Sequence, residues 1–157
     1  MKSLKSLGMV MVLAMALGMG AGCSKKNAEV EVIEAPVATV SAVELAAQQI
    51  SDGIILFDFN KYDIKAEYRE VLQQAAELMK QHPSIKVRLE GHCDARGTQE
   101  YNLALGERRA LAAKEYLLRK GIADNRIRTV SYGEEKPAGN DDAQNRRDEF
   151  IGVTLKK

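Results

Sequence analysis

The segment IKVRLEGHC, from Ile85 to Cys93, alternates small or apolar residues with polar ones along its whole length. Neighbouring side chains on a strand point to opposite faces, so this pattern predicts a strand with one covered face and one polar face. Apolar residues then recur at helical spacing from Leu103 to Leu118, and Gly121 is a typical stop signal. A strand followed by a long amphipathic helix indicates a fold in which helices pack on a sheet.

Three further strands and one further helix are expected in the same part of the chain. Ile54 to Phe59 is β-rich and apolar, and Arg126 to Tyr132 and Glu149 to Leu155 also predict strands. A helix is expected between Asp63, its predicted N-cap, and Pro83, which closes it. The expected fold class is α/β (α+β), a two-layer sandwich in which a mixed four-stranded sheet carries two main helices on one face.

The N-terminus carries a targeting signal. Lys2 and Lys5 precede an apolar run from Leu7 to Gly22, which is shorter than the roughly 20 residues of a membrane-spanning helix. A charged start, a short apolar centre and small residues before a break predict a secretory signal peptide over residues 1–22.

Cys23 ends that segment, and Ala21-Gly22-Cys23 resembles the end of a bacterial lipobox, with Gly20 where leucine is more common. Cys23 is therefore the expected lipidation site; an ordinary signal peptide with an incidental cysteine is the alternative. Ser24, by resemblance to sorting rules, favours the outer membrane. Residues 23–50 are expected to form the lipidated N-terminus and a flexible linker, with a helical turn or two in VELAAQQI, and residues 51–157 one folded domain.

Charge and cysteine content limit the function classes. Without Lys2 and Lys5, 21 basic residues remain beside 22 acidic ones, so no basic excess supports a nucleic-acid partner. If Cys23 is lipidated, Cys93 has no partner within the chain, and no disulfide is expected.

The sequence GHCD suggests thiol chemistry, but the strand pattern opposes it. His92 and Cys93 point to opposite faces, so we expect Cys93 to be a buried, inert side chain. The two histidines, His82 and His92, lack metal-ligand spacing, and no nucleophile or nucleotide motif occurs. No enzyme activity, cofactor or metal is expected.

Asp94 stands where the strand from Ile85 meets a loop, with Gly97 for a tight turn and Thr98 as a possible helix cap. Asp94 either organises this turn through local backbone bonds or belongs to a charged site. Arg108 and Arg109 follow on the helix; because neighbours diverge by about 100°, at most one can face a pocket beside Asp94. The helix pattern does not decide which.

The segment GHCDARGTQEYNLALGERRA, together with FDFNKYDI, SYGEEKPA and NRR, resembles the OmpA-like peptidoglycan-binding domain. The resemblance covers about Ile54 to Leu155. With the lipobox and the short linker, the chain is most similar to the lipid-anchored members of that family, the peptidoglycan-associated lipoproteins.

The resemblance implies a ligand and a set of binding residues. The ligand is the meso-diaminopimelate side chain of the peptidoglycan stem peptide, which carries an ammonium and a carboxylate. Asp94 aligns with the ammonium-binding aspartate of the family and Arg109 with its carboxylate-binding arginine. The neighbouring candidates are Phe59, Asn60, Thr98, Asn102 and Leu105.

Other implications concern partners and location. Asn60 stands where the family often has aspartate, and Asn145, Arg146 and Arg147 match a motif expected to be mainly structural. The resemblance implies a periplasmic domain that tethers the outer membrane to the wall, with TolB and other Tol proteins as partners. The alternatives are an OmpA-like lipoprotein outside the Tol system and a wall hydrolase that uses His92, Cys93 and Asp94.

Overall fold

The computed structural model describes residues 41–154, so the expected signal peptide, Cys23 and the first part of the expected linker lie outside the described residues. The helices and strands follow in the order α1 (Ala42–Ser51), β1 (Ile54–Leu56), α2 (Arg69–Gln81), β2 (Ile85–His92), α3 (Gln99–Arg119), β3 (Ile127–Gly133), α4 (Asp142–Asn145) and β4 (Arg147–Thr154). Single 3-10 turns, Ala66–Tyr68 and Asp124–Arg126, precede α2 and β3.

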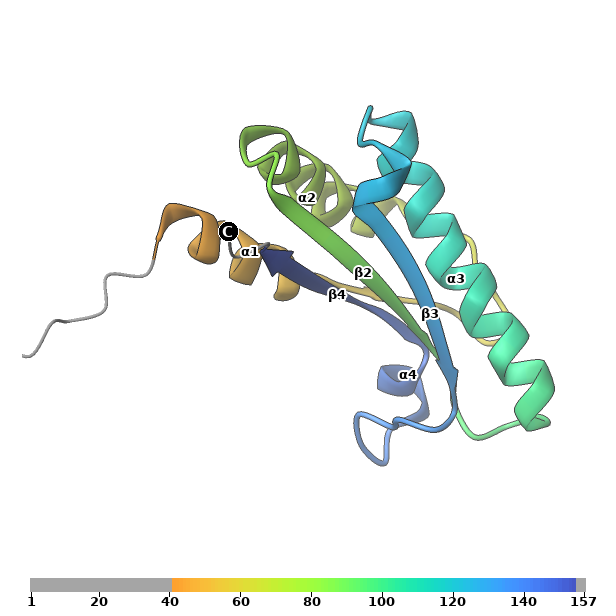
Figure 1. Ribbon diagram of the computed structural model, residues 1–157. Coiled ribbons are helices and arrows are strands. Elements are labelled where there is room, and N and C mark those ends of the chain that lie inside the picture. The colour runs from red at the N-terminus through yellow and green to blue at the C-terminus, as the bar shows by residue number, and fades with distance from the viewer. Residues whose placement is uncertain (1–40, 155–157) are drawn as a thin grey trace, which may run out of the picture. The chain divides into compact units, whose positions relative to one another are not determined.

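The four strands form one mixed sheet in the order β1-β4-β2-β3 (Figure 1). β4 is antiparallel to both β1 and β2, whereas β2 and β3 are parallel. Parallel neighbours need a long crossover, and α3 provides it between β2 and β3. The expected two-layer α/β fold with a mixed four-stranded sheet is confirmed.

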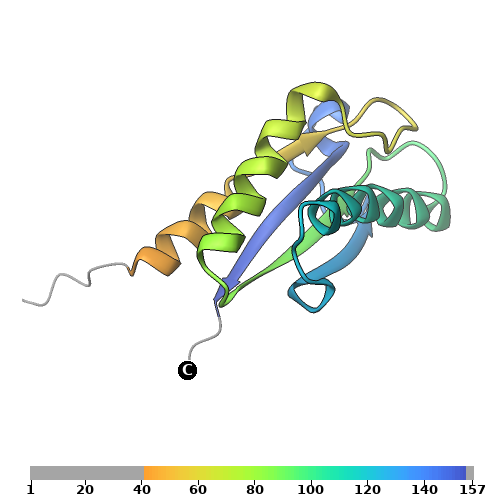
Figure 2. The same cartoon turned by 90° about the horizontal axis from the view of Figure 1, so that it is seen from above.

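The helices α1, α2 and α3 bury their apolar residues in one core against the sheet. The sheet contributes Ile55, Ile85, Val87, Leu89, Ile127 and Phe150. Figures 1 and 2 show α2 and α3 along one side of the strands. None of the helices between residues 41 and 154 is both long enough and apolar enough to cross a membrane.

One of these helices was expected to be only a short turn in the linker. Ala46, Ala47 and Ile50 of α1 are buried, and a β-carbon on Gly152 of β4 would overlap the backbone of Ala47. The folded part therefore begins before residue 51, the boundary that the sequence analysis set, and the layer of main helices has three members.

The sequence signals for the ends of helices and strands were correct at some positions and wrong at others. Thr98 caps α3 as expected, because its hydroxyl accepts a hydrogen bond from the Tyr101 amide at 3.2 Å, and Gly121 follows the helix with a φ of 87°. Asp63 is not an N-cap: α2 starts six residues later, behind a 3-10 turn, with Tyr68 as its cap and no side-chain hydrogen bond there. β1 ends at Leu56, three residues before the expected end.

The other face of the sheet carries none of the three main helices α1, α2 and α3, and we call it the open face. Register places Glu90 of β2 opposite Glu149 of β4, and Arg88 of β2 beside Arg128 of β3. Strand alternation assigns to this face Lys86, Arg88, Glu90, His92, Arg128, Val130, Arg147, Glu149, Ile151 and Val153.

Candidate functional site

A hollow of about 240 Å³ opens where β2 ends and α3 begins, and we call it the Asp94 hollow. It is lined by Phe59, Asn60, Cys93, Asp94, Arg96, Gly97, Tyr101, Asn102, Leu105, Arg109 and Arg146. Segments far apart in the sequence thus meet around the residue that first suggested a site. Among the ionisable lining residues are three arginines and one carboxylate besides the thiol, so the hollow carries a surplus of positive charge.

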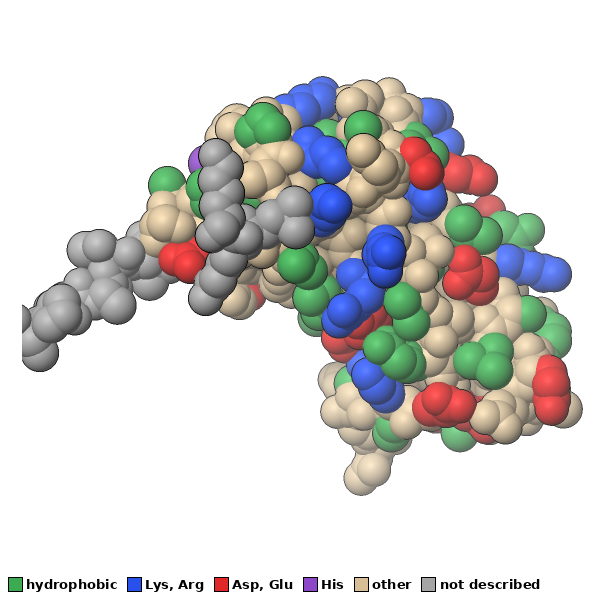
Figure 3. Space-filling model, in the orientation of Figure 1, with side chains coloured by type: hydrophobic (Ala, Val, Ile, Leu, Met, Phe, Trp, Pro, Cys, Tyr) green, Lys and Arg blue, Asp and Glu red, His purple; other side chains and the backbone are tan. Residues whose placement is uncertain are grey.

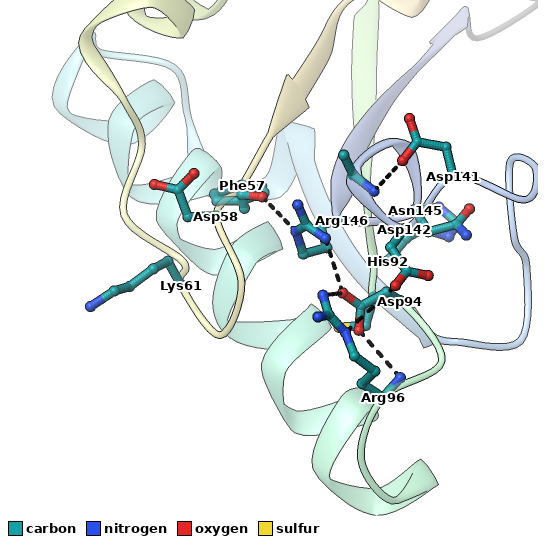
Figure 4. Close-up of polar contacts among 12 residues, drawn as sticks. Phe57, Asp58, Lys61, His92, Asp94, Arg96, Asp141, Asp142, Asn145 and Arg146 are labelled. Atoms are coloured by element: carbon teal, nitrogen blue, oxygen red, sulfur yellow. Dashed lines mark hydrogen bonds and ion pairs between the residues drawn. The ribbon is translucent and has the colours of Figure 1, made fainter.

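Asp94 is only 3 % exposed and is held by two arginines. Its Oδ2 accepts from Nη2 of Arg96 at 2.5 Å and from Nη1 of Arg146 at 3.1 Å, and Figure 4 shows both guanidinium groups pointing at this carboxylate. Among residues 41–154, its Oδ1 accepts only the Arg96 amide, at 3.3 Å. Burial raises the pKa of Asp94, but the hydrogen bonds from Arg96 and Arg146 outweigh it and hold the pKa below the usual value.

Arg96 also forms the wall of the hollow with Phe59. Its guanidinium carbon lies 4.1 Å from the centre of the Phe59 ring, a cation–π contact. Both side chains are accessible, since Phe59 is 56 % exposed and the side chain of Arg96 is half exposed. A ligand entering the hollow therefore meets an apolar ring and a cation first.

Arg109 occupies the inner end of the hollow, is 0 % exposed, and stacks 5.0 Å from the centre of the Phe57 ring. Its Nε donates to the carbonyl of Lys61 at 2.9 Å, its Nη1 to the carbonyl of His92 at 2.6 Å and its Nη2 to that of Asp58 at 3.3 Å. Burial lowers the pKa of Arg109, partly opposed by the negative charges nearby.

These contacts settle which of the two neighbouring arginines faces Asp94. Arg109 lines the hollow, whereas Arg108 is exposed on the outer side of α3. Arg109 uses three N–H groups on carbonyls and directs a fourth at the Cys93 sulfur, 3.5 Å away. A guanidinium has five N–H groups, so one N–H group of Arg109 takes no part in these four contacts.

Asn60 lies at the rim in a left-handed conformation, with a φ of 57°. Asparagine adopts this conformation more readily than most residues, which gives a backbone reason for its presence. Its Oδ1 accepts the hydroxyl hydrogen bond of Tyr101, a residue of α3 that the sequence analysis did not select.

Three other expected binding residues have different surroundings. Leu105 is buried and forms an apolar part of the wall. Asn102 lines the hollow, but its amide donates to the Asp94 carbonyl at 3.2 Å and to Glu134 at 2.5 Å, so it orders the loop. Thr98 does not line the hollow, because its hydroxyl caps α3.

The Asn145-Arg146-Arg147 motif divides into three roles. Asn145 orders the loop before β4 by accepting from the Ala138 amide at 2.7 Å, and Arg147 pairs with Glu149 at 2.5 Å on the open face. Arg146 differs from the expectation of a mainly structural arginine. It lines the hollow and holds Asp94, because adjacent residues at the start of β4 point to opposite faces.

Arg96 is the main residue that sequence reasoning missed. The sequence contained a signal for it, because a cation two residues after Asp94 in a loop can fold back onto that carboxylate. Both the amide and the side chain of Arg96 contact Asp94 in this way. Tyr101 has a weaker signal, namely its place in the first turn of α3 after the Thr98 cap.

The thiol hypothesis finds no support in this geometry. Burial raises the pKa of the Cys93 thiol to about 11, and its sulfur contacts Arg109 and the Asn102 carbonyl. His92 lies on the opposite face, stacked on Tyr132 with 5.5 Å between ring centres, and burial lowers the pKa of its imidazole. No base therefore faces the thiol from β2.

The same histidine belongs to a cluster of potential metal ligands. Ligand atoms of Glu90, His92 and Glu149 lie within 4.8 Å of one another. Both carboxylates are already paired with arginines, Glu90 with Arg88 at 2.6 Å and Glu149 with Arg147 at 2.5 Å. These cations repel a divalent ion, so the cluster fits a partly buried ion-pair network better than a metal site.

Comparison with known proteins decides the family. Residues 56–149 match the OmpA family. The chain belongs to the OmpA family. A relative from Haemophilus influenzae named peptidoglycan-associated lipoprotein is 44 % identical over 130 residues, which cover 80 % of this chain and 84 % of the relative. A relative of the same name from Pasteurella multocida is 50 % identical over 98 residues, covering 59 % of this chain and 65 % of the relative.

Solved structures share the fold of this chain. The crystal structure of the peptidoglycan-associated lipoprotein from Burkholderia pseudomallei is 41 % identical, with a TM-score of 0.62, and the match covers 64 % of this chain and 89 % of that one. The C-terminal domain of Helicobacter pylori MotB, at 20 % identity and a TM-score of 0.60, shares the fold over 65 % of this chain and 84 % of its own.

Proposed function

We propose that this chain is a lipoprotein that binds peptidoglycan without cleaving it and tethers the outer membrane to the cell wall. The Asp94 hollow is the binding site, the acyl chains on Cys23 are the anchor, and the folded domain lies in the periplasm. The observation that carries the proposal is a nearly buried carboxylate facing three arginines in one hollow. The names of the relatives, each called a peptidoglycan-associated lipoprotein, support it.

The ligand is the meso-diaminopimelate part of the stem peptide. Its ammonium fits Asp94, whose Oδ1 accepts a single backbone amide from the described residues and keeps a lone pair for a ligand. Its carboxylate fits the positive end of the hollow, where Arg109 is fixed by three carbonyls and Arg96 is accessible. Because the lining charge is positive in sum, a ligand with more carboxylates than ammonium groups is favoured.

The binding experiment uses the mature chain with Cys23→Ser, titrated calorimetrically with a diaminopimelate-containing stem peptide. We expect saturable binding that Asp94→Asn weakens about tenfold or more, since a charge-assisted hydrogen bond contributes roughly 1.5–3 kcal/mol. Asp52→Asn, an exposed carboxylate at the end of α1, is the matched control and should bind as the parent chain does.

A second pair of variants tests the arginine. Arg109→Lys keeps the charge but loses the planar fork whose three nitrogens hold three separate carbonyls, whereas Arg108→Lys makes the same change on the exposed side of α3. We expect weaker binding only for Arg109→Lys, with circular dichroism showing that each variant is folded. Absence of binding by the parent chain, or equal binding by Asp94→Asn, would falsify the proposed site.

We further propose that the partners include TolB and other Tol proteins, and that TolB and peptidoglycan compete for the domain. A ternary complex in which neither ligand weakens the other would contradict the competition. Failure of the chain to capture TolB would favour an OmpA-like lipoprotein outside the Tol system. A wall hydrolase is opposed by the raised pKa of Cys93, and release of fragments from sacculi that Cys93→Ser abolishes would be needed to revive it.

A further inference from the structure

A second concave surface lies on the open face, at the end of the sheet where β2 begins and β4 ends. It is a hollow of about 350 Å³, which we call the basic hollow, lined by Lys86, Val87, Arg88, Asn125, Arg126, Arg128 and Val153. Four of these seven residues are cationic and none is acidic. Figure 3 shows Lys and Arg side chains gathered along the strands of this face.

The cations of the basic hollow are placed where they repel one another. Arg88 and Arg128 are register partners on the parallel strands β2 and β3, and Lys86 lies two residues before Arg88 on the same face. Like charges at such positions destabilise a sheet. Arg88 is compensated by Glu90 at 2.6 Å, but the exposed Lys86 and Arg128 form no ion pair with any residue between 41 and 154. A bound anion would relieve this repulsion.

Arg126 gives the hollow a fixed cation. Its Nε donates to the Ile85 carbonyl at 3.0 Å, and its Nη2 donates to the carbonyls of Met79 at 2.7 Å and His82 at 3.0 Å. These bonds satisfy carbonyls at the C-terminal end of α2 and hold the guanidinium in one position. No hydrogen bond to a described residue involves its Nη1.

The basic hollow lies at the same end of the sheet as the start of α1, so the proposed anchor at Cys23 is joined to the domain at this end. Figures 1 and 2 show the start of α1 and the end of β4 at the same end of the sheet, and Lys86 pairs in register with Val153 near the end of β4. Asp94 follows the other end of β2. Lys86 and Asp94 are eight positions apart, which corresponds to about 26 Å along the strand direction.

We propose that the basic hollow binds the phosphate headgroups of anionic lipids in the membrane that carries the N-terminal anchor. The inference depends on the anchor at Cys23 that is part of the proposed function. The chain from Cys23 to Ser41 can span about 60 Å at most, which keeps the domain within reach of the leaflet. The planar donor forks of the arginines match phosphate, and the exposed Val153 supplies an apolar contact at the rim.

The test measures flotation of the mature chain with Cys23→Ser on vesicles that mix phosphatidylglycerol with phosphatidylcholine. Vesicles of phosphatidylcholine alone are the reference. We expect binding only to the anionic vesicles, weakened by salt and reduced about tenfold or more by Lys86→Gln with Arg128→Gln. The matched control is Lys80→Gln with Arg108→Gln, which removes two exposed cations from α2 and α3 and should leave binding unchanged.

Several results would overturn the proposal. One is absence of binding to anionic vesicles; another is an equal loss in the control variant, which would indicate net charge instead of a site. Binding of polyglutamate at Lys86 and Arg128 without vesicle binding would assign the hollow to an acidic protein partner. Binding of inorganic phosphate without vesicle binding would assign it to a free anion.

The same variants separate this inference from the proposed function. Both double variants should bind the stem peptide as the parent chain does, because neither pair lines the Asp94 hollow. Vesicle binding without stem-peptide binding would contradict the proposed function and leave the basic hollow intact. Stem-peptide binding without vesicle binding would contradict lipid binding at the basic hollow and leave the proposed function unaffected.

Discussion

Gly91 of β2 and Gly106 of α3 lie in backbone contact, where a β-carbon added to Gly91 would overlap the carbonyl of Gly106. One added to Gly106 would press on the carbonyl oxygen of Gly91, 2.9 Å away. Three residues beyond this crossing, the loop after β2 contains Asp94 and the helix reaches Arg109. The close approach therefore sets the spacing of the two charged residues on which the Asp94 hollow depends.

Gly91→Ala should lower the free energy of unfolding by about 3 kcal/mol, since the added methyl meets backbone that cannot move aside. Gly139→Ala is the control: no atom lies within 4 Å of its added β-carbon, and the change should stay within about 0.5 kcal/mol. Urea denaturation measures both. Equal, small changes would mean that α3 shifts freely on the sheet.

Cys93 should be inert in the folded chain. Its buried thiol has a pKa of about 11, so at pH 8 very little thiolate is present to react. With Cys23→Ser in place, we expect iodoacetamide to label Cys93 at pH 8 in urea but not in buffer, as followed by mass spectrometry. Rapid labelling of the folded chain would require an accessible thiolate and would reopen the thiol hypothesis.

The strands and helices that local patterns encode were predictable, and those that depend on distant contacts were not. The alternation from Ile85 and the stripe after Leu103 correspond to β2 and α3. α1 was underestimated because only Ala46, Ala47 and Ile50 become buried, and what fixes them is the absence of a side chain at Gly152. The start of β4 was predicted too late, at Glu149, because its first two residues, Arg147 and Asp148, are charged although they are buried, so no apolar pattern marks them.

The candidate site shows the same division. Asp94 was selected from its place after a strand, and the family resemblance selected Arg109 over Arg108. Arg146 was not selected, because its ion pair with Asp94 joins residues 52 positions apart and no local pattern encodes such a pairing. Arg96 could have been selected, because its contact with Asp94 joins residues only two positions apart in one loop.

Asp94 should stabilise the fold only where its carboxylate is ionised. The ion pairs with Arg96 and Arg146 lower its pKa in the folded state, so its contribution is complete above the unfolded pKa of about 3.9 and is lost as the pH falls through the folded value. Asp94→Asn should therefore cost about 1–3 kcal/mol at pH 7 and progressively less below pH 4, measured by urea denaturation. A cost that does not change with pH would show that the charge of Asp94 is not the stabilising feature.

Asp148 should have the opposite dependence on pH. It is 0 % exposed on the core face of β4, and neither carboxylate oxygen has a hydrogen-bond partner among the described residues. Burial raises its pKa well above the usual value, opposed by the charge of Arg109. Because the folded pKa exceeds the unfolded one, its contribution is complete below about pH 4 and is lost as the pH rises, at about 1.4 kcal/mol per pH unit up to the folded pKa.

Asp148→Asn keeps the shape of the uncharged aspartic acid side chain and removes its ionisation. We expect the free energies of unfolding of the variant and the parent chain to be closest at pH 4. As the pH rises towards 8, the variant should become more stable relative to the parent. Urea denaturation across this range measures the difference. If the variant instead became less stable than the parent with rising pH, Asp148 would be ionised and paired with Arg109, and the inner wall of the Asp94 hollow would then be less positive than the proposed ligand requires.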